Sequence, residues 1–130
     1  MQVSLEIVPR SEESLRAAAA SAAVFSSVSA INVPDLLRFP IRSWEACATL
    51  TSSCAPDVAG REEDGGHCRF DLIPHLRAID FDPDRPFPYG EALRQASVKR
   101  VLAIAGDPPQ YMKRRVYPTS TIDFIRKLKT

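Results

Sequence analysis

The stretch KRVLAIAGDPP, residues 99–109, decides the fold class because its apolar run ends abruptly at a glycine, a carboxylate and two prolines. Val101–Ala105 contains no polar side chain, which is typical of a parallel strand covered on both faces. Gly106 lets the backbone turn or approach a ligand closely, and Pro108 prevents the strand from continuing. We therefore expect Asp107 at the C-terminal edge of a sheet, where this strand ends.

The same order, a strand followed by a helix, recurs about four times along the chain. Ser11 and Ser43 are expected to cap the first two helices, and Pro74 is unusual for a central strand. The alternation predicts a parallel α/β sheet in a single domain spanning residues 1–130. The expected strands cover residues 3–9, 26–33, 71–80 and 99–105, the expected helices cover residues 11–23, 43–50, 90–97 and 119–129, and residues 52–69 are expected to form a loop.

Composition narrows the classes of function. Of 130 residues, 45% are apolar and 25% are charged, which is the balance of a globular domain. The net charge of +1 gives no bias toward nucleic acid or an anionic membrane. The low-charge stretch 17–33 is too short and too rich in serine to span a bilayer. The basic cluster Lys113–Arg115 fits a solvated loop, with contact to an anionic phosphate as the alternative.

Cysteine usage predicts a reducing compartment. The chain has three cysteines, and this odd number favours a cytoplasmic protein over a disulfide framework. Cys54 and the pair His67 and Cys68 lack the C-x-x-C spacing of zinc sites. We therefore expect buried or loop thiols and no metal site.

Polar side chains stand near the end of each expected strand. Because the carboxyl ends of parallel strands meet at one edge of a sheet, and binding sites collect there, these residues are the candidates for function. Glu6 lies on the strand face opposite Val3, Leu5 and Ile7, so packing of those three would direct it to the interior of the sheet's curve. A carboxylate desolvated there is a candidate general acid. The full set is Glu6, Asn32, Asp35, His75, Arg77, Asp80 and Asp107.

Each candidate also has a purely structural interpretation. Glu6 is equally consistent with a solvated position, and Asp107 with a turn residue that caps the next helix. His75 is consistent with a hydrogen-bonded histidine in the core. Trp44 and Tyr117 fit packing better than stacking on a ligand.

Four stretches together resemble the methylenetetrahydrofolate reductase family. SLEIVPR, residues 4–10, is similar to its opening strand, in which a single glutamate precedes apolar or aromatic residues and proline. PHLRAID, residues 74–80, resembles its third-strand motif of His-Leu, two variable residues and Ile-Asp. VLAIAGDPP, residues 101–109, resembles the fourth-strand motif ending in Gly-Asp and prolines, and VYPTSTIDFIRKLK, residues 116–129, resembles the segment after it. Their order and rough spacing agree along the whole chain.

The resemblance implies a TIM (β/α)8 barrel of which this chain supplies the N-terminal half. It implies a flavin, FAD in preference to FMN, and reduction of methylenetetrahydrofolate to methyltetrahydrofolate with electrons from NADH or NADPH. By this likeness Glu6 is the general acid that protonates a folate nitrogen, and Asp107 lies beside the flavin and the pterin ring. The implied cofactor-binding residues are Asn32, His75, Gly106, Asp107 and Tyr117.

The chain departs from the family pattern in three ways. Ala105 stands where the family commonly has arginine before Gly-Asp, and Ile7 and Val8 replace an aromatic pair. A barrel needs eight strand–helix units and roughly 250 residues, whereas four units leave two open edges and an exposed concave face. We therefore expect a homo-oligomer or a partner chain that completes the barrel. The alternatives are a non-catalytic remnant that binds flavin or folate in association with another chain, and an unrelated open α/β domain.

Overall fold

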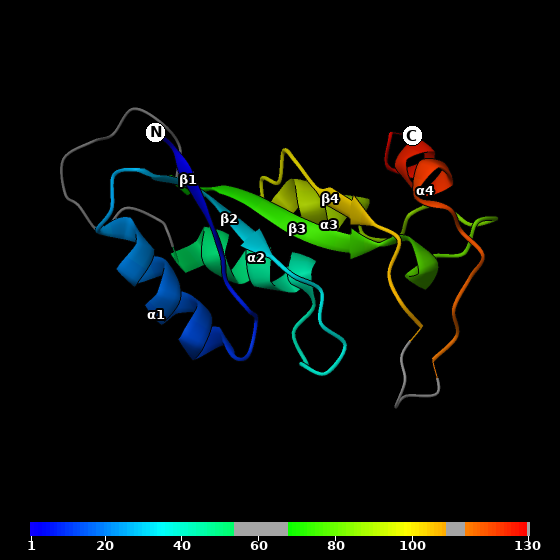
Figure 1. The fold of residues 1–130 in the computed structure, drawn as a ribbon, viewed down its shortest axis with the longest axis horizontal. Coiled ribbons are helices and arrows are strands. Elements are labelled where there is room, and N and C mark those ends of the chain that lie inside the picture. Colours follow the sequence, from blue (N-terminus) through cyan, green and yellow to red (C-terminus); the bar gives the residue numbers. More distant parts are fainter. Residues whose placement is uncertain (54–67, 109–113, 130) are drawn as a thin grey trace.

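The chain folds around one sheet of four parallel strands. The computed structural model describes residues 1–53, 68–108 and 114–129. The strands are β1 (Val3–Glu6), β2 (Val28–Val33), β3 (Asp71–Arg77) and β4 (Leu102–Ile104), which lie side by side in sequence order (Figure 1). Every neighbouring pair is parallel, so the prediction of a parallel α/β sheet is confirmed. Residues 54–67 of the expected loop, which include Cys54 and His67, lie outside the described residues, as do Pro109 and Lys113.

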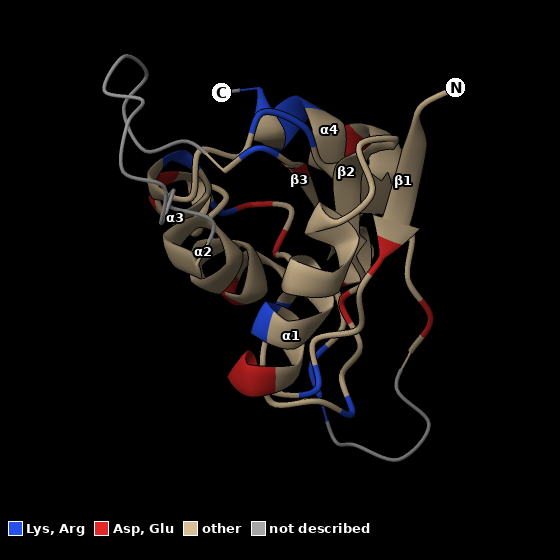
Figure 2. Cartoon of the chain, turned by 90° about the vertical axis from the view of Figure 1, so that its left-hand side faces the viewer, with Lys and Arg blue, Asp and Glu red and all other residues tan. Residues whose placement is uncertain are grey.

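Three of the described helices gather on one side of the sheet, and the last helix of the chain lies beyond the C-terminal end of β4 (Figure 1). The helices are α1 (Glu12–Ala23), α2 (Ser43–Ser53), α3 (Gly90–Gln95) and α4 (Thr121–Leu128). Figure 2 shows α1, α2 and α3 together on one side of β1, β2 and β3. When parallel strands are wound in sequence order, each connecting helix returns over the same face. In the described part of the chain, the other face of the sheet therefore has no helical cover.

Strand register assigns each side chain to one of these two faces. Ile31 pairs with Leu72, and both are buried against the helices. The next residues along the strands, Asn32 and Ile73, also pair and point to the opposite face because side chains alternate along a strand. We call the helix-covered side the helix face, with Ile31, Val33, Leu72 and Leu76. We call the other side the open face, with Glu6, Asn32, Ile73, His75, Leu102 and Ile104.

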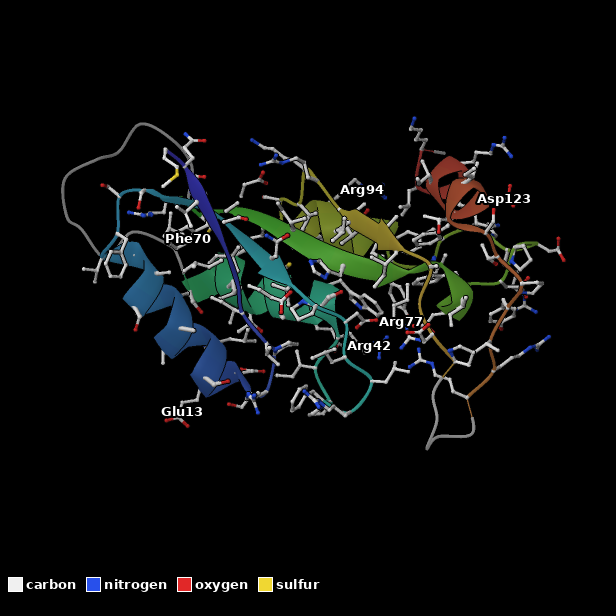
Figure 3. The ribbon with its side chains drawn as sticks, viewed as in Figure 1. Glu13, Arg42, Phe70, Arg77, Arg94 and Asp123 are labelled. Carbon is white, nitrogen blue, oxygen red and sulfur yellow. The ribbon has the colours of Figure 1, made fainter. Side chains whose placement is uncertain are left out.

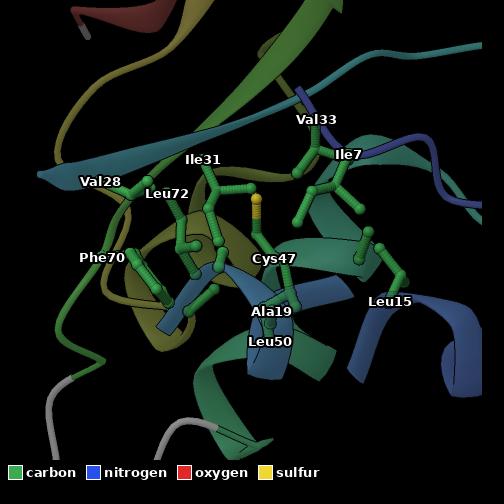
Figure 4. Packing of buried hydrophobic residues seen from close by; sticks show 13 residues of the cluster. Ile7, Leu15, Ala19, Val28, Ile31, Val33, Cys47, Leu50, Phe70 and Leu72 are labelled. Atoms are coloured by element: carbon green, nitrogen blue, oxygen red, sulfur yellow. The ribbon is translucent and has the colours of Figure 1, made fainter. Parts of the chain in front are cut away.

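The hydrophobic core lies between the helix face and the helices. Its larger cluster packs Ile31 and Leu72 against Leu15 of α1 and against Cys47 and Leu50 of α2 (Figure 4). Burial raises the pKa of the Cys47 thiol to about 12, so this cysteine is a packing residue. A second cluster near the C-terminal end of β3 contains Trp44, Leu76, Ala78, Phe81, Leu93 and Phe124.

Local sequence signals account for the ends of the helices. Ser11 caps α1 as predicted, and together with Ser14 it forms a reciprocal capping box. Ser120 caps α4 by accepting the backbone N–H of Asp123. The prediction that Ser43 caps α2 is wrong: Ser43 is the first residue of the helix, and its hydroxyl donates to the backbone oxygen of His75 at 2.7 Å. This bond ties α2 to β3, which is a tertiary role that local sequence does not encode.

Three strand predictions need correction. β1 ends at Glu6, before Pro9, and β3 ends at Arg77, where a single 3-10 turn (Ala78–Asp80) begins. β3 is nevertheless a central strand that contains the buried Pro74. β4 is not covered on both faces, because Leu102 on the open face is 44% exposed. The apolar run of β4 therefore faces helices on one side only.

No helix in the described ranges is both long and apolar enough to cross a membrane.

Candidate functional site

Three of the predicted site residues form a row across the open face. Glu6 at the end of β1 pairs in register with Asn32 on β2, and Asn32 pairs with Ile73 on β3. His75 lies two residues further along β3 and on the same face. Its Nε2 lies 3.5 Å from the amide oxygen of Asn32, an oxygen that can only accept, so the contact fits the tautomer with a proton on Nε2. The fold thus brings together Glu6, Asn32 and His75 from three strands.

The row combines an uncharged imidazole with an accessible carboxylate. Partial burial lowers the pKa of His75 below its ordinary value, and the nearby Glu6 carboxylate opposes that shift. His75 is therefore neutral at neutral pH, with Nδ1 available as an acceptor. The desolvation expected for Glu6 is not found, because this residue is exposed on the open face. The interior position that the sequence predicted needs a second layer over this face.

The Gly106–Asp107 turn packs against the end of β3. Gly106 has φ +84°, and a Cβ placed on it would lie 2.9 Å from Nε of Arg77 and 3.2 Å from Cγ1 of Ile79. Only glycine therefore fits this approach. The Arg77 guanidinium donates to the backbone oxygen of Asp107, and Ile79 N–H donates to Ala105 O at 3.2 Å. The sequence left open whether this glycine allows a close approach to a ligand. In the structure, the close approach is to the end of β3 in the same chain.

Asp107 itself is presented to solvent. Asp107 is exposed, and its backbone oxygen accepts a hydrogen bond from the Arg77 guanidinium. The alternative that Asp107 caps the next helix is wrong, because Ser120 caps α4. Asp107 and Glu6 lie at the same C-terminal edge of the sheet, but Glu6 ends β1 and Asp107 follows β4, and these are the two outermost strands. The fold does not place these two carboxylates next to each other.

A cluster of charged side chains joins the loops that follow β2 and β3. Asp80 is 3.3 Å from Arg42 and 3.7 Å from both Arg77 and Arg114, measured between its Oδ2 and a guanidinium nitrogen of each. Arg42 also pairs closely with Asp35, which follows β2. Figure 3 shows Arg42 and Arg77 near the end of β3. These pairs hold the loops at the C-terminal edge in fixed relative positions.

The carboxylates of this cluster are buried deeply. Both Asp35 and Asp80 have side chains with no more than 2% of their surface exposed. Burial raises the pKa of Asp35, although the Arg42 guanidinium and the backbone N–H of Ser43 lower it in part. The sequence predicted Asp35, Arg77 and Asp80 as edge residues, but it gave no sign of Arg42. Only the fold brings Arg42 against Asp80, which is 38 residues away in the chain.

Of the two aromatic candidates, Trp44 packs against the chain as expected, and Tyr117 is held through its backbone. Trp44 is 6% exposed, and its ring stacks on Tyr89 with centroids 4.3 Å apart. Tyr117 donates its backbone N–H to Ile79 O at 2.8 Å, and the Arg115 guanidinium lies 5.0 Å from the centre of its ring. Because Ile79 also bonds the 105–107 turn, the short segment after β3 positions both Asp107 and Tyr117.

The open face has the chemistry of a site for a flat heteroaromatic ring, but it does not enclose one. Hydrogen-bonding groups from the row of Glu6, Asn32 and His75 stand beside the apolar side chains of Ile73 and Leu102. A ring with a polar edge fits such a surface, as an isoalloxazine or a pterin would. The four main cavities of the described residues are lined by other residues. The residues present therefore fit the implied flavin in kind, and its enclosure requires further protein.

Comparisons with known proteins return no match: no family model, no curated protein and no solved structure is similar to this chain at a significant level. Within the described ranges, no group of three or more histidine, cysteine, aspartate or glutamate residues could hold a metal ion. The resemblance of the four sequence motifs thus remains a prediction.

Proposed function

We propose that this chain forms the first four strand–helix units of a TIM barrel oxidoreductase, a flavoprotein that resembles methylenetetrahydrofolate reductase. The proposed reaction reduces methylenetetrahydrofolate to methyltetrahydrofolate, with NADH or NADPH as electron donor and FAD as the expected flavin. The sequential parallel sheet with three helices on one face supports this proposal, because a barrel is wound in that way. The open face then corresponds to the barrel interior.

The row on the open face is the observation on which the proposal rests. Glu6, Asn32 and His75 come from three neighbouring strands and lie near the strand ends where TIM barrels hold their active sites. The Gly106–Asp107 turn lies at the same edge and is fixed by Arg77.

The proposed chemistry gives each residue a distinct task. Glu6, when protonated, donates its proton to the folate nitrogen of the methylene bridge, the carbon–nitrogen bond breaks, and a cationic iminium remains. When bound, the flavin supplies the hydride that reduces this carbon to a methyl group, after the nicotinamide has reduced the flavin. Neutral His75 and the Asn32 amide hydrogen-bond to the edge of a bound ring. Asp107 orients the ring system at the mouth of the barrel.

The accessibility of Glu6 sets a condition on this function. A general acid that works near neutral pH needs a desolvated environment, and here Glu6 is exposed. A second copy of the chain or a partner chain that covers the open face would provide that environment and would pair the free edges of β1 and β4. Activity is therefore proposed for the completed barrel.

Flavin binding and the two half-reactions test the proposal. The purified chain is titrated with FAD, its mass in solution is measured, and reduction of flavin by NADPH is followed separately from oxidation of reduced flavin by methylenetetrahydrofolate. Glu6→Gln should abolish the folate half-reaction and leave the nicotinamide half-reaction intact. Glu12→Gln, which removes an exposed carboxylate from α1, is the matched control and should affect neither.

The competing function is a non-catalytic remnant that binds flavin or folate through association with another chain. The exposure of Glu6 and the lack of enclosure on the open face favour it. A protein that binds FAD but shows neither half-reaction would support the remnant. Equal loss of both half-reactions in Glu6→Gln would contradict the acid role, and a monomer that takes up no FAD would contradict the flavoprotein proposal.

A further inference from the structure

The loops at the C-terminal edge enclose a second polar site, on the side of the helices. A cavity of about 180 Å³ lies beside the ionic cluster, between the start of α2, the turn after β3 and the segment before α3. The proposed reduction uses none of its residues. The lining residues are Arg42, Trp44, Asp80, Phe81, Pro88, Tyr89 and Arg114.

Two arginines and one aspartate, Arg42, Arg114 and Asp80, are the charged residues that line this cavity. Beside it, Asp35 pairs with Arg42, Arg77 pairs with Asp80, and the Glu45 carboxylate accepts the backbone N–H of Arg42. The side chains of Asp35, Asp80 and Arg77 are at least nine-tenths buried, and Arg42 is 15% exposed. Arg114, whose side chain is 34% exposed, is therefore the more accessible of the two guanidinium groups that line the cavity.

The arginines at the cavity keep donors that their carboxylate partners do not use. The terminal nitrogen of Arg114 is 3.7 Å from Asp80, which is beyond hydrogen-bonding distance. Arg42 uses a single terminal nitrogen for both Asp35 and Asp80. Its Nε, the Nε of Arg77 and the acceptor Oδ1 of Asp80 are all buried without a hydrogen-bond partner among the described residues, so a bound anion that keeps one proton could accept from Arg42 and donate to Asp80. A guanidinium group has five N–H donors in a planar fork that matches the oxygens of an anion. An anion of two or three oxygens would satisfy this set.

Aromatic rings form another part of the cavity wall. Trp44 stacks on Tyr89, and the Arg42 guanidinium lies 5.2 Å from the centre of a Trp44 ring. Such a wall holds the guanidinium in place and excludes water from one side, which strengthens its attraction for an anion.

We propose that this cavity binds an anionic group, a phosphate or a carboxylate, through Arg114 and Arg42 against the wall formed by Trp44 and Tyr89. The proposal does not depend on the reductase function. A nucleotide would bring a phosphate to this site, and an acidic peptide-like tail would bring a carboxylate.

The only tryptophan of the chain lines the cavity, so its fluorescence reports on this site directly. Trp44 emission is followed while the full chain is titrated with inorganic phosphate, with adenosine 2′,5′-bisphosphate as the nucleotide probe, and with triglutamate as the carboxylate probe. Ionic strength is held constant with sodium chloride. A saturable change with phosphate is expected. Tighter binding of the bisphosphate identifies a nucleotide phosphate, and tighter binding of triglutamate identifies a carboxylate.

Two matched variants decide whether the site is specific. Arg114→Gln should weaken phosphate binding about tenfold, because one charge-assisted contact is lost. Arg115→Gln removes the neighbouring charge, whose guanidinium lies over Tyr117 and not at the cavity, and should change the affinity less than about twofold. An equal loss in the two variants, or a response that sodium chloride reproduces, would overturn the proposal and leave the cluster as a structural ion network. Far-ultraviolet circular dichroism verifies that both variants are folded.

Discussion

The two faces of the sheet are made from the same strands but have opposite characters. On the helix face, Ile31 and Leu76 are completely buried, and the helices cover them with aliphatic and aromatic side chains. On the open face, Glu6 is exposed and Leu102 is 44% exposed. One residue along β2 separates Ile31, which packs in the core, from Asn32, whose side chain lies on the open face. The comparison shows that stability and candidate function are divided between the two faces.

The largest expected effect tests that division of stability. Ile31→Ala on the helix face should lower the free energy of unfolding by about 3 kcal/mol, because it leaves a cavity in a packed core. Ile73→Ala, on the open face of the adjacent strand, should cost less than about 1 kcal/mol. Urea unfolding followed by circular dichroism measures both. Similar losses in the two variants would show that the open face is packed in solution, and a concentration-dependent midpoint would identify a second copy as the cover.

A smaller loss of stability is expected from a substitution at Gly106, in the turn at the C-terminal edge of the sheet. Gly106→Ala should destabilise the chain by roughly 1–3 kcal/mol, since alanine is strained at φ +84° and its Cβ would crowd Arg77 and Ile79. Gly90→Ala is the control, because its Cβ would meet only an Arg94 side-chain atom at 3.6 Å.

Thermal unfolding compares these two glycine variants. The control should be neutral or slightly stabilising, as alanine favours a helix. If Gly106→Ala were as stable as the control, the close approach of the turn to β3 would not exist in solution.

The smallest expected effect is a pH dependence that belongs to the open face. Burial lowers the pKa of His75, so the unfolded chain binds a proton more readily than the folded chain below about pH 6.5. The contribution of His75 to stability is therefore complete above that pH and is lost as the pH falls from there through the lower pKa of the folded state. His75→Gln should flatten this part of the profile of unfolding free energy against pH.

The companion measurement for the same residue is an NMR titration of the His75 imidazole. Because the Glu6 carboxylate raises the pKa of His75, Glu6→Gln should move the titration midpoint to lower pH. An unchanged midpoint would mean that Glu6 and His75 do not interact across the face.

The sequence predicted a parallel α/β sheet and part of the candidate site. Three signals in the sequence depend on residues only a few positions apart. They are the alternation in residues 3–7, the apolar run before Gly106 and the serine cap at Ser11. These signals placed the strands and helices in order, and parallel pairing then followed from the connections. They also placed Asn32 and His75 near the ends of adjacent strands. The meeting of these two side chains, which are 43 positions apart, required the register of the sheet.

What the sequence determined by itself was therefore local: which segments are strands, which are helices, and which polar residues follow them. The tertiary structure alone decided that Ser43 bonds to β3, that Gly106 approaches Arg77, that Arg42 lies between two aspartates, and that Glu6 remains in water. Periodicity and capping depend on contacts between residues a few positions apart, so both can be recognised in the sequence. Burial and ion pairing depend on what packs opposite a side chain, and that is fixed only when distant segments have been brought together.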